Sequence, residues 1–94
     1  MRFRDKDLDR LESDSSYSLG HDPAIVKAFR KRMQFIRGAL NEQDFYALKS
    51  LHYEKLKGAR THQRSMCLND KMRLIVEIEV AGAERVIVGI EDYH

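Results

Sequence analysis

The sequence predicts an α+β fold in which a helical hairpin packs on a small, mainly antiparallel β-sheet. Three observations support this prediction. Apolar residues recur at helical spacing between residues 23 and 40, they alternate with polar residues from residue 64 onward, and turn-forming residues separate these runs. At 94 residues the chain is expected to form one domain over residues 1–94. Such a domain buries roughly 60 to 65% of its unfolded surface.

The N-terminal part of the sequence predicts only a short strand and a short helix. Residues 2–4 allow a first strand, and Leu8 and Leu11 allow a short helix that ends before a polar loop at residues 13–16. These elements precede the stronger helix signals.

A longer helix is predicted from Pro23 onward. Asp22 can cap free amide groups at its start, and proline at the first helical position loses no useful donor. One apolar stripe then follows at spacings of three and four: Val26, Phe29, Met33, Ile36 and Leu40. Asn41, followed three residues later by Asp44, resembles a weaker capping box. A second helix over about 42–50 is therefore expected to form a hairpin with the first.

Three strands are predicted after residue 64, each with its apolar side chains on one face. Turns at Asn69-Asp70 and Ala81-Gly82 would join them. The buried positions would be Met66 and Leu68 in the first strand, Met72, Leu74, Val76 and Ile78 in the second, and Val86, Val88 and Ile90 in the third.

The same alternation places Arg73 on the face away from the core. If the last two strands pair apolar with apolar positions, Arg73 lies opposite Gly89 or Glu91, and Tyr93 lies one diagonal step away on the same face. The sequence therefore predicts a pocket that holds Arg73 and Tyr93. Three residues of the preceding loop are expected to enter it: His52, Lys57 and Arg60.

Charge is unevenly distributed, although the formal net charge is only +2. Residues 1–22 hold six acidic and four basic side chains, whereas residues 27–37 hold five basic side chains and no acidic one. Residues 49–64 add five basic side chains and two histidines against one acid. A basic segment of this kind is typical of a solvated face or of a surface that follows RNA.

The composition favours a cytoplasmic protein. The single cysteine, Cys67, excludes an internal disulfide framework. No apolar run is long enough to span a membrane, and the first residues lack the apolar segment of a signal peptide. His21, His52 and His62 lack the spacing of a metal site, so neither a metal nor another cofactor is expected.

The second half of the chain contains three short motifs. They are Lys55-Leu56-Lys57-Gly58-x-Arg60, then Arg64-Ser65-x-x-Leu68-Asn69-Asp70-x-x-Arg73-Leu74, and finally Asp92-Tyr93-His94. In combination they resemble the HigB branch of the RelE/ParE toxin superfamily, whose members are the toxins of type II toxin-antitoxin operons.

The resemblance implies a RelE-like fold and a ribosome-dependent, metal-independent endoribonuclease, an mRNA interferase that cuts messenger RNA in the decoding site and inhibits translation. The key strand arginine of the family matches Arg73, its loop lysine matches Lys57, and its terminal tyrosine matches Tyr93. The histidine that some members carry three residues before the loop lysine is Glu54 here. The implied partners are the ribosome with its messenger RNA, a HigA-like helix-turn-helix antitoxin, and operator DNA bound indirectly through that antitoxin.

The requirements of RNA cleavage indicate roles for the same residues. Metal-free RNA cleavage needs a base for the 2′-hydroxyl, cations for the charge that develops at phosphorus, and an acid for the leaving 5′-oxygen. A guanidinium binds phosphate in a forked geometry, and a lysine crowded by cations can act as a base. We expect the catalytic residues to be Lys57, Arg73, Tyr93 and His94, and the RNA-binding residues to be His52, Lys55, Arg60 and Arg64. The proton-transfer roles stay open.

Plainer interpretations and other functions fit the same pattern. Arg73 beside Glu77 and Glu91 is typical of a cross-strand charge pair, and residues 55–60 are typical of a solvated turn. The main functional alternative is a ParE-like toxin that binds and inhibits DNA gyrase without RNA cleavage. A non-toxic scaffold that acts only in corepression through its partner is a third option.

Overall fold

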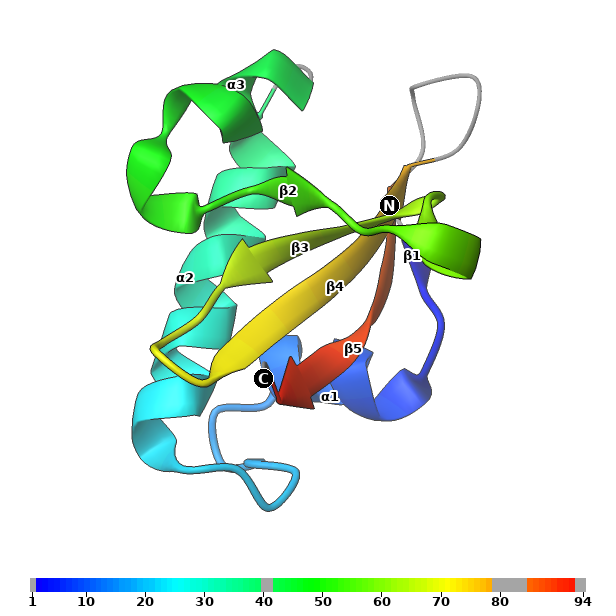
Figure 1. The fold of residues 1–94 in the computed structure, drawn as a ribbon. Coiled ribbons are helices and arrows are strands. Elements are labelled where there is room, and N and C mark those ends of the chain that lie inside the picture. The colour runs from blue at the N-terminus through cyan, green and yellow to red at the C-terminus, as the bar shows by residue number, and fades with distance from the viewer. Residues whose placement is uncertain (1, 40–41, 79–84, 93–94) are drawn as a thin grey trace.

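The computed structural model describes residues 2–39, 42–78 and 85–92 (Figure 1). Within these residues the α+β prediction is confirmed, because three α-helices accompany one five-stranded mixed sheet. The helices are α1 (Lys6–Ser13), α2 (Pro23–Gly38) and α3 (Glu42–Ala47), with short 3₁₀ turns η1 (Lys49–Leu51) and η2 (Gly58–Arg60). The strands are β1 (Arg2–Phe3), β2 (Glu54–Lys55), β3 (Gln63–Cys67), β4 (Met72–Ile78) and β5 (Arg85–Asp92).

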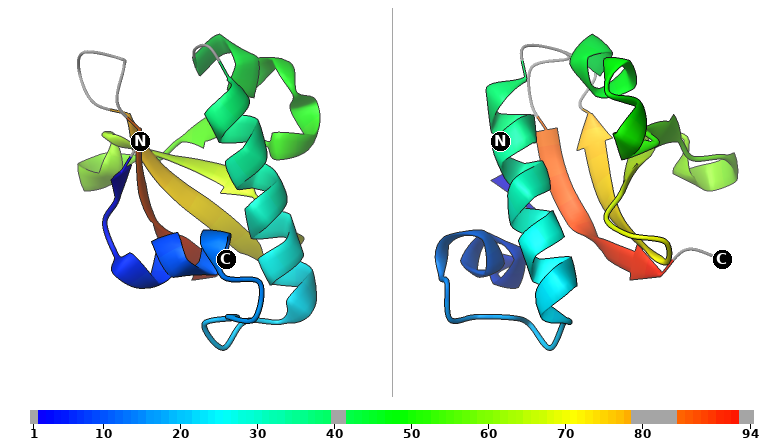
Figure 2. Two further views of the ribbon diagram at one scale, coloured as in Figure 1. Left: turned by 180° about the vertical axis from the view of Figure 1, so that it is seen from behind. Right: turned by 90° about the vertical axis from the view of Figure 1, so that its left-hand side faces the viewer.

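The sheet has the strand order β1-β5-β4-β3-β2. Strand β1 runs parallel to β5, and the other neighbours are antiparallel, as expected for a mainly antiparallel sheet. Helices α1 and α2 cover one face, and η2 stands on the opposite side of the sheet from α2 (Figure 2). We call the face toward α1 and α2 the helix face, and the other one the outer face.

Helix α2 forms where the sequence predicts it. The Asp22 carboxylate accepts a hydrogen bond of 2.9 Å from the backbone amide of Ala24, and Pro23 occupies the first turn. The buried residues of α2 form its apolar stripe, which begins with the adjacent Ile25 and Val26 and continues at steps of three or four with Phe29, Met33 and Ile36. The expected stripe residue Leu40 lies outside the described residues.

The second predicted helix is shorter than expected. Helix α3 ends at Ala47 because Leu48 adopts an extended conformation, and the separate turn η1 follows. Its aromatic side chain Phe45 is fully buried and contacts Phe35 of α2, with 5.8 Å between the ring centroids. This contact joins α3 to the C-terminal part of α2.

The arginines of α2 are held by the protein itself. Arg30 donates hydrogen bonds to three backbone carbonyls within residues 11–17, and Arg32 donates to the carbonyl of Cys67. Arg37 forms a two-pronged ion pair with a carboxylate of α1. The basic segment is therefore not one solvated cationic face, because its arginines anchor neighbouring segments.

Strand β5 departs from the predicted alternation. Two adjacent residues of β4 pair with Ile87 and Gly89, so Val88 is an extra residue in β5. This β-bulge reverses which side chains face the helices. Ile87 is fully buried in the core, whereas Val86 pairs with Glu77 on the outer face. The prediction that Val86 faces the helices is therefore wrong, although Val86 is itself buried on the outer face, and Val88 is the extra residue, to which no ladder pair assigns a face.

Of the other strand positions predicted to be buried, Met66, Leu68, Leu74 and Val76 are buried, and Met72 and Ile90 are partly buried against the core. Asn69 makes the turn between β3 and β4, since its side-chain oxygen accepts hydrogen bonds from the backbone amides of Lys71 and Met72. The predicted turn at Ala81-Gly82 lies outside the described residues. One core joins the helices to the helix face: Leu8, Leu11, Ile25, Val26, Phe29, Met33, Ile36, Phe45, Leu51, Tyr53, Met66, Leu68, Leu74, Val76 and Ile87.

Over the described residues, no helix combines the length and the apolar character that crossing a membrane requires.

Candidate functional site

The candidate site lies on the outer face, at the N-terminal end of β4, where Arg73 is the second residue. In the ladder Arg73 pairs with Cys67 of β3 and with Glu91 of β5. Directly opposite residues point to the same side of a sheet, so these three share the outer face. The next residue, Leu74, is fully buried in the core. The predicted outward orientation of Arg73 is confirmed, and Glu91 is its partner.

Arg73 is held firmly, since only 11% of its side chain is exposed. Its Nε donates a hydrogen bond of 2.9 Å to Ser65 Oγ, and its Nη2 donates one of 2.6 Å to the carbonyl oxygen of His52. The carboxylate of Glu54 lies 3.7 Å from Nη2. These contacts fix the guanidinium plane against the sheet, so its charge is placed before any ligand arrives.

His52 contributes to this arrangement through its backbone. The residue has φ 47° and ψ 46°, a left-handed conformation that is uncommon for a residue with a Cβ atom. This turn follows η1 directly and directs the carbonyl toward Arg73, while the residue itself is exposed. We predicted an imidazole at the site, and the described contact to Arg73 is made by the carbonyl oxygen.

A hollow of about 210 Å³ opens beside Arg73. Its walls come from β3, β4, β5 and the loop that includes η2. It is lined by two cations, two acids and three other side chains: Arg60, Arg73, Glu91, Asp92, Leu56, Ser65 and Ile75. The hollow is thus a mixed-charge site and not a purely cationic one.

Arg60 enters the hollow from η2, as predicted, and is bound to a carboxylate there. Its two terminal nitrogens donate to the two oxygens of Glu91 at 2.9 and 2.6 Å, and its Nε donates to the Gln63 side-chain oxygen at 2.8 Å. The hydrogen bonds to Glu91 raise the pKa of the Arg60 guanidinium. Both partners are about half exposed, at 44% and 43%, so solvent and ligands can reach the pair.

The same chain of contacts continues across the outer face to the far edge of the sheet. Glu77 accepts hydrogen bonds of 2.9 Å from Gln63 Nε2 and 2.7 Å from Arg4, and His62 Nε2 lies 3.5 Å from it. The hydrogen bond from Gln63, followed by the charge of Arg4, lowers the pKa of the Glu77 carboxyl. This network ties the loop before β3 to strands β4 and β1.

Lys55, at the end of β2, and Lys57, between β2 and η2, are exposed. Within residues 2–39, 42–78 and 85–92, neither ammonium group forms a hydrogen bond or an ion pair. Lys57 directly precedes Gly58, whose φ of 68° favours glycine. Lys57 therefore stands at the start of the turn that carries Arg60, but it does not line the hollow.

Arg64 lies away from this site. It pairs with Val76 in the ladder, a core residue, so it points to the helix face. There its Nε donates a hydrogen bond of 3.0 Å to Glu42 of α3, which also accepts one of 2.6 Å from the Tyr53 hydroxyl. Burial and the contact with Glu42 raise the pKa of Tyr53. Arg64 thus links β3 to α3 through Glu42, on the opposite face of the sheet from Arg73.

Two predicted catalytic residues, Tyr93 and His94, lie outside the described residues. The sequence reasoning assigned no role to Ser65 or Gln63, which orient Arg73 and Arg60. Strand alternation was the available signal for both residues, because it places them on the same face as Arg73.

Among the described residues, no three His, Cys, Asp or Glu side chains gather closely enough to hold a metal ion. The sequence matches no protein-family model and no curated protein. The arrangement itself provides an oriented guanidinium and a second arginine bound to a half-exposed carboxylate, with the exposed Lys57 at the start of the turn that carries Arg60, whereas Lys55 pairs with Arg64 and lies toward the helix face. Such a set can bind a phosphate group and stabilise added charge on it.

Proposed function

We propose that this protein is a HigB-like toxin of the RelE/ParE superfamily, with a RelE-like fold, that cleaves messenger RNA on the ribosome and so inhibits translation in the cytoplasm. A helix-turn-helix antitoxin from the same operon would inhibit it. The observation that carries the proposal is the fixed guanidinium of Arg73, bound by Ser65 Oγ and the His52 carbonyl at the edge of the hollow. The resemblance of the three sequence motifs supports it.

In the proposed reaction the 2′-hydroxyl oxygen attacks the adjacent phosphorus. A base takes the 2′-hydroxyl proton, the bond from phosphorus to the 5′-oxygen breaks, and an acid gives that oxygen a proton. The products are a 2′,3′-cyclic phosphate and a free 5′-hydroxyl. Arg73 would stabilise the charge on the phosphorus centre, and Lys57 would add a second cation. Both proton-transfer roles stay unassigned.

The Arg60–Glu91 pair has a defined part in this proposal. Exposed ion pairs contribute only about 0 to 1 kcal/mol, so an RNA phosphate can replace Glu91 on Arg60 at small cost. Until then Glu91 keeps Arg60 turned toward the hollow. Because the hollow also carries the acids Glu91 and Asp92, RNA binding to the free protein would be weak, and the ribosome would have to position the substrate.

The deciding experiment maps cut sites on a transcript after brief induction of the protein. We expect cuts within translated codons that are lost with Arg73→Lys, because lysine keeps the charge but not the forked geometry. Lys57→Ala should reduce cleavage strongly, and Lys6→Ala is the matched control, since Lys6 is an exposed lysine of α1. Cuts that persist in Arg73→Lys contradict the proposed site. Growth arrest without cuts, accompanied by DNA gyrase inhibition, would favour the ParE-like alternative.

A second variant separates the two groups that His52 offers. Glycine tolerates the left-handed conformation at this position, so His52→Gly keeps the carbonyl contact with Arg73 and removes only the imidazole. If purified protein with ribosomes cleaves normally in this variant, the contribution of His52 is the backbone oxygen. A large loss of cleavage at unchanged thermal stability would assign the imidazole a direct role.

A further inference from the structure

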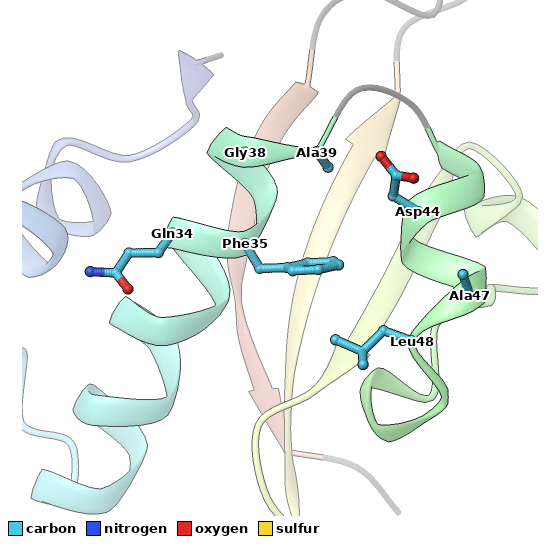
Figure 3. A pocket seen from close by; sticks show the side chains of 7 residues that line it. All are labelled: Gln34, Phe35, Gly38, Ala39, Asp44, Ala47 and Leu48. Carbon is cyan, nitrogen blue, oxygen red and sulfur yellow. The ribbon is translucent and has the colours of Figure 1, made fainter.

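A second surface feature lies far from the Arg73 hollow, between the C-terminal end of α2 and helix α3. It is an open groove of about 520 Å³ (Figure 3). Phe35 and Leu48 point toward one another across it, and Asp44 and Ala39 mark one end. The full lining is mostly apolar or small: Gln34, Phe35, Gly38, Ala39, Asp44, Ala47 and Leu48. The groove is therefore suited to apolar side chains and not to phosphate.

The groove is not filled by the described part of the chain. Leu48, which follows α3, is 40% exposed, which is unusual for a large aliphatic side chain, and Tyr46 of α3 is 50% exposed. A Cβ atom built on Gly38 meets nothing within 4 Å. Gly38 is thus not required by the packing of the protein itself, and its lack of a side chain leaves room for another backbone.

Basic residues continue from the groove along α2. Lys31 lies one helical turn before Phe35, and Lys27 lies one turn before Lys31, so both continue the stripe that ends at Gly38. Lys49 directly follows Leu48. Lys27, Lys31 and Lys49 are exposed, and in the part of the chain that the structure describes their ammonium groups form no hydrogen bond or ion pair. Unlike the arginines of α2, these lysines are available to a partner.

The length of this surface indicates what would occupy it. From Lys27 to Gly38 the stripe covers 11 residue steps along α2, or about 16 Å at the rise of an α-helix. A ligand that fills the groove and also reaches the lysines must be equally long. An amphipathic helix meets this requirement, because residues spaced by three and four place an apolar row beside a charged row.

We propose that the α2–α3 groove is a docking site for an amphipathic helix of another protein, with apolar residues seated against Phe35 and Leu48 and acidic residues over Lys31 and Lys27. This docking site is independent of RNA cleavage, since it shares no residue with the Arg73 hollow.

The test uses a library of displayed helical peptides. Peptides that bind the Gly38→Leu variant are removed first, and the remaining peptides are then selected for binding to the wild-type protein. Leucine at position 38 fills the groove and also favours the helix, so this variant should be at least as stable as the wild type. The control is Gly89→Leu, because Gly89 is also open at its Cβ position but lies in β5, paired with Ile75 on the outer face.

Selected peptides should carry apolar residues at helical spacing and acidic residues beside them. Gly38→Leu and Leu48→Glu should each weaken a selected peptide by about tenfold or more, and Lys31→Glu should weaken it severalfold, whereas Gly89→Leu should leave the Kd unchanged. Selection of basic or non-amphipathic peptides overturns the proposal, as does equal binding to wild type and Gly38→Leu. Self-association that Gly38→Leu abolishes would assign the groove to a second copy instead. Gly38→Leu should still cleave RNA if the proposed function holds, so the two proposals fail separately.

Discussion

The two faces of the sheet are stabilised by different interactions. On the helix face, fully buried side chains such as Phe29, Met33 and Leu74 form one apolar core. On the outer face, a chain of hydrogen-bonded charged and polar side chains extends from Glu91 to Arg4. Burial of apolar side chains contributes much of the free energy of folding but does not fix the orientation of individual groups. Hydrogen bonds between charged side chains fix the orientation of those groups but add little net stability. The helix face therefore stabilises the fold, and the outer face positions groups for function.

The largest expected effect tests the helix face. Phe29→Ala removes a fully buried ring from the middle of α2 and should cost about 3 to 5 kcal/mol of the free energy of unfolding. Urea denaturation of the purified protein measures this cost. Lys31→Ala, on the exposed side of the same helix, is the control and should change the free energy by less than about 0.5 kcal/mol. A small loss for Phe29→Ala would mean that the helix face is not the main source of stability.

The next effect tests the outer face. An arginine on the solvent face of a sheet contributes little to stability, but only 11% of the Arg73 side chain is exposed and it makes two strong hydrogen bonds, so Arg73→Ala should lower the free energy of unfolding by about 2 kcal/mol. A double-mutant cycle with Ser65→Ala measures how much of this comes from the Nε contact. Cleavage must then be compared at a temperature where the variant is folded. An unchanged free energy of unfolding would show that these hydrogen bonds contribute nothing measurable.

The sequence predicts the helix face better than the outer face. The stripe from Val26 to Ile36 and the alternation from Met66 to Val76 are local patterns, and the structure confirms them. The bulge at Val88 is not visible in the pattern, because the run from Val86 to Ile90 offers apolar residues to either face. Such a run does not specify its own register, so pairing with β4 decides it.

For the candidate site, the alternation of side chains along the strands predicts which face of the sheet a residue occupies. It predicts correctly that Arg73 points outward, and the same parity places Arg64 with Met66 on the helix face, which makes Arg64 a poor choice for the site. The pairing of Arg60 with Glu91 could not be predicted, since 31 residues separate them and both are ordinary charged residues. Long-range partners of this kind depend on how loops lie across the sheet.

A smaller effect concerns pH. The pKa of Glu77 is lowered below its ordinary value of 4.5, so its ionised form stabilises the folded state. That contribution is complete above pH 4.5 and is lost as the pH falls through the lower folded-state pKa. Glu77→Gln should therefore lower the free energy of unfolding by about 1 kcal/mol near neutral pH, with the difference shrinking in acid.

Thermal unfolding across this pH range measures the effect of Glu77→Gln. His62 Nε2 lies 3.5 Å from Glu77, so the variant His62→Gln separates the contribution of His62 from that of Arg4. A difference between wild type and Glu77→Gln that does not change with pH would show that the carboxylate charge is irrelevant to stability.

The smallest expected effect concerns the pair that faces the hollow. Arg60 and Glu91 are each about half exposed, so a double-mutant cycle of Arg60→Ala and Glu91→Gln should give a coupling of about 0 to 1 kcal/mol, weakened by added salt. A weak coupling leaves Arg60 free to exchange Glu91 for an RNA phosphate, whereas a coupling above about 2 kcal/mol would make the pair part of the fold. If the coupling is weak, Glu91→Gln should raise RNA affinity, because it removes the acid that competes with phosphate for Arg60. If the coupling is strong, it should not. Weaker RNA binding by Glu91→Gln would mean that Glu91 positions Arg60 for the substrate, and the outer face would then need this ion pair intact to act on RNA.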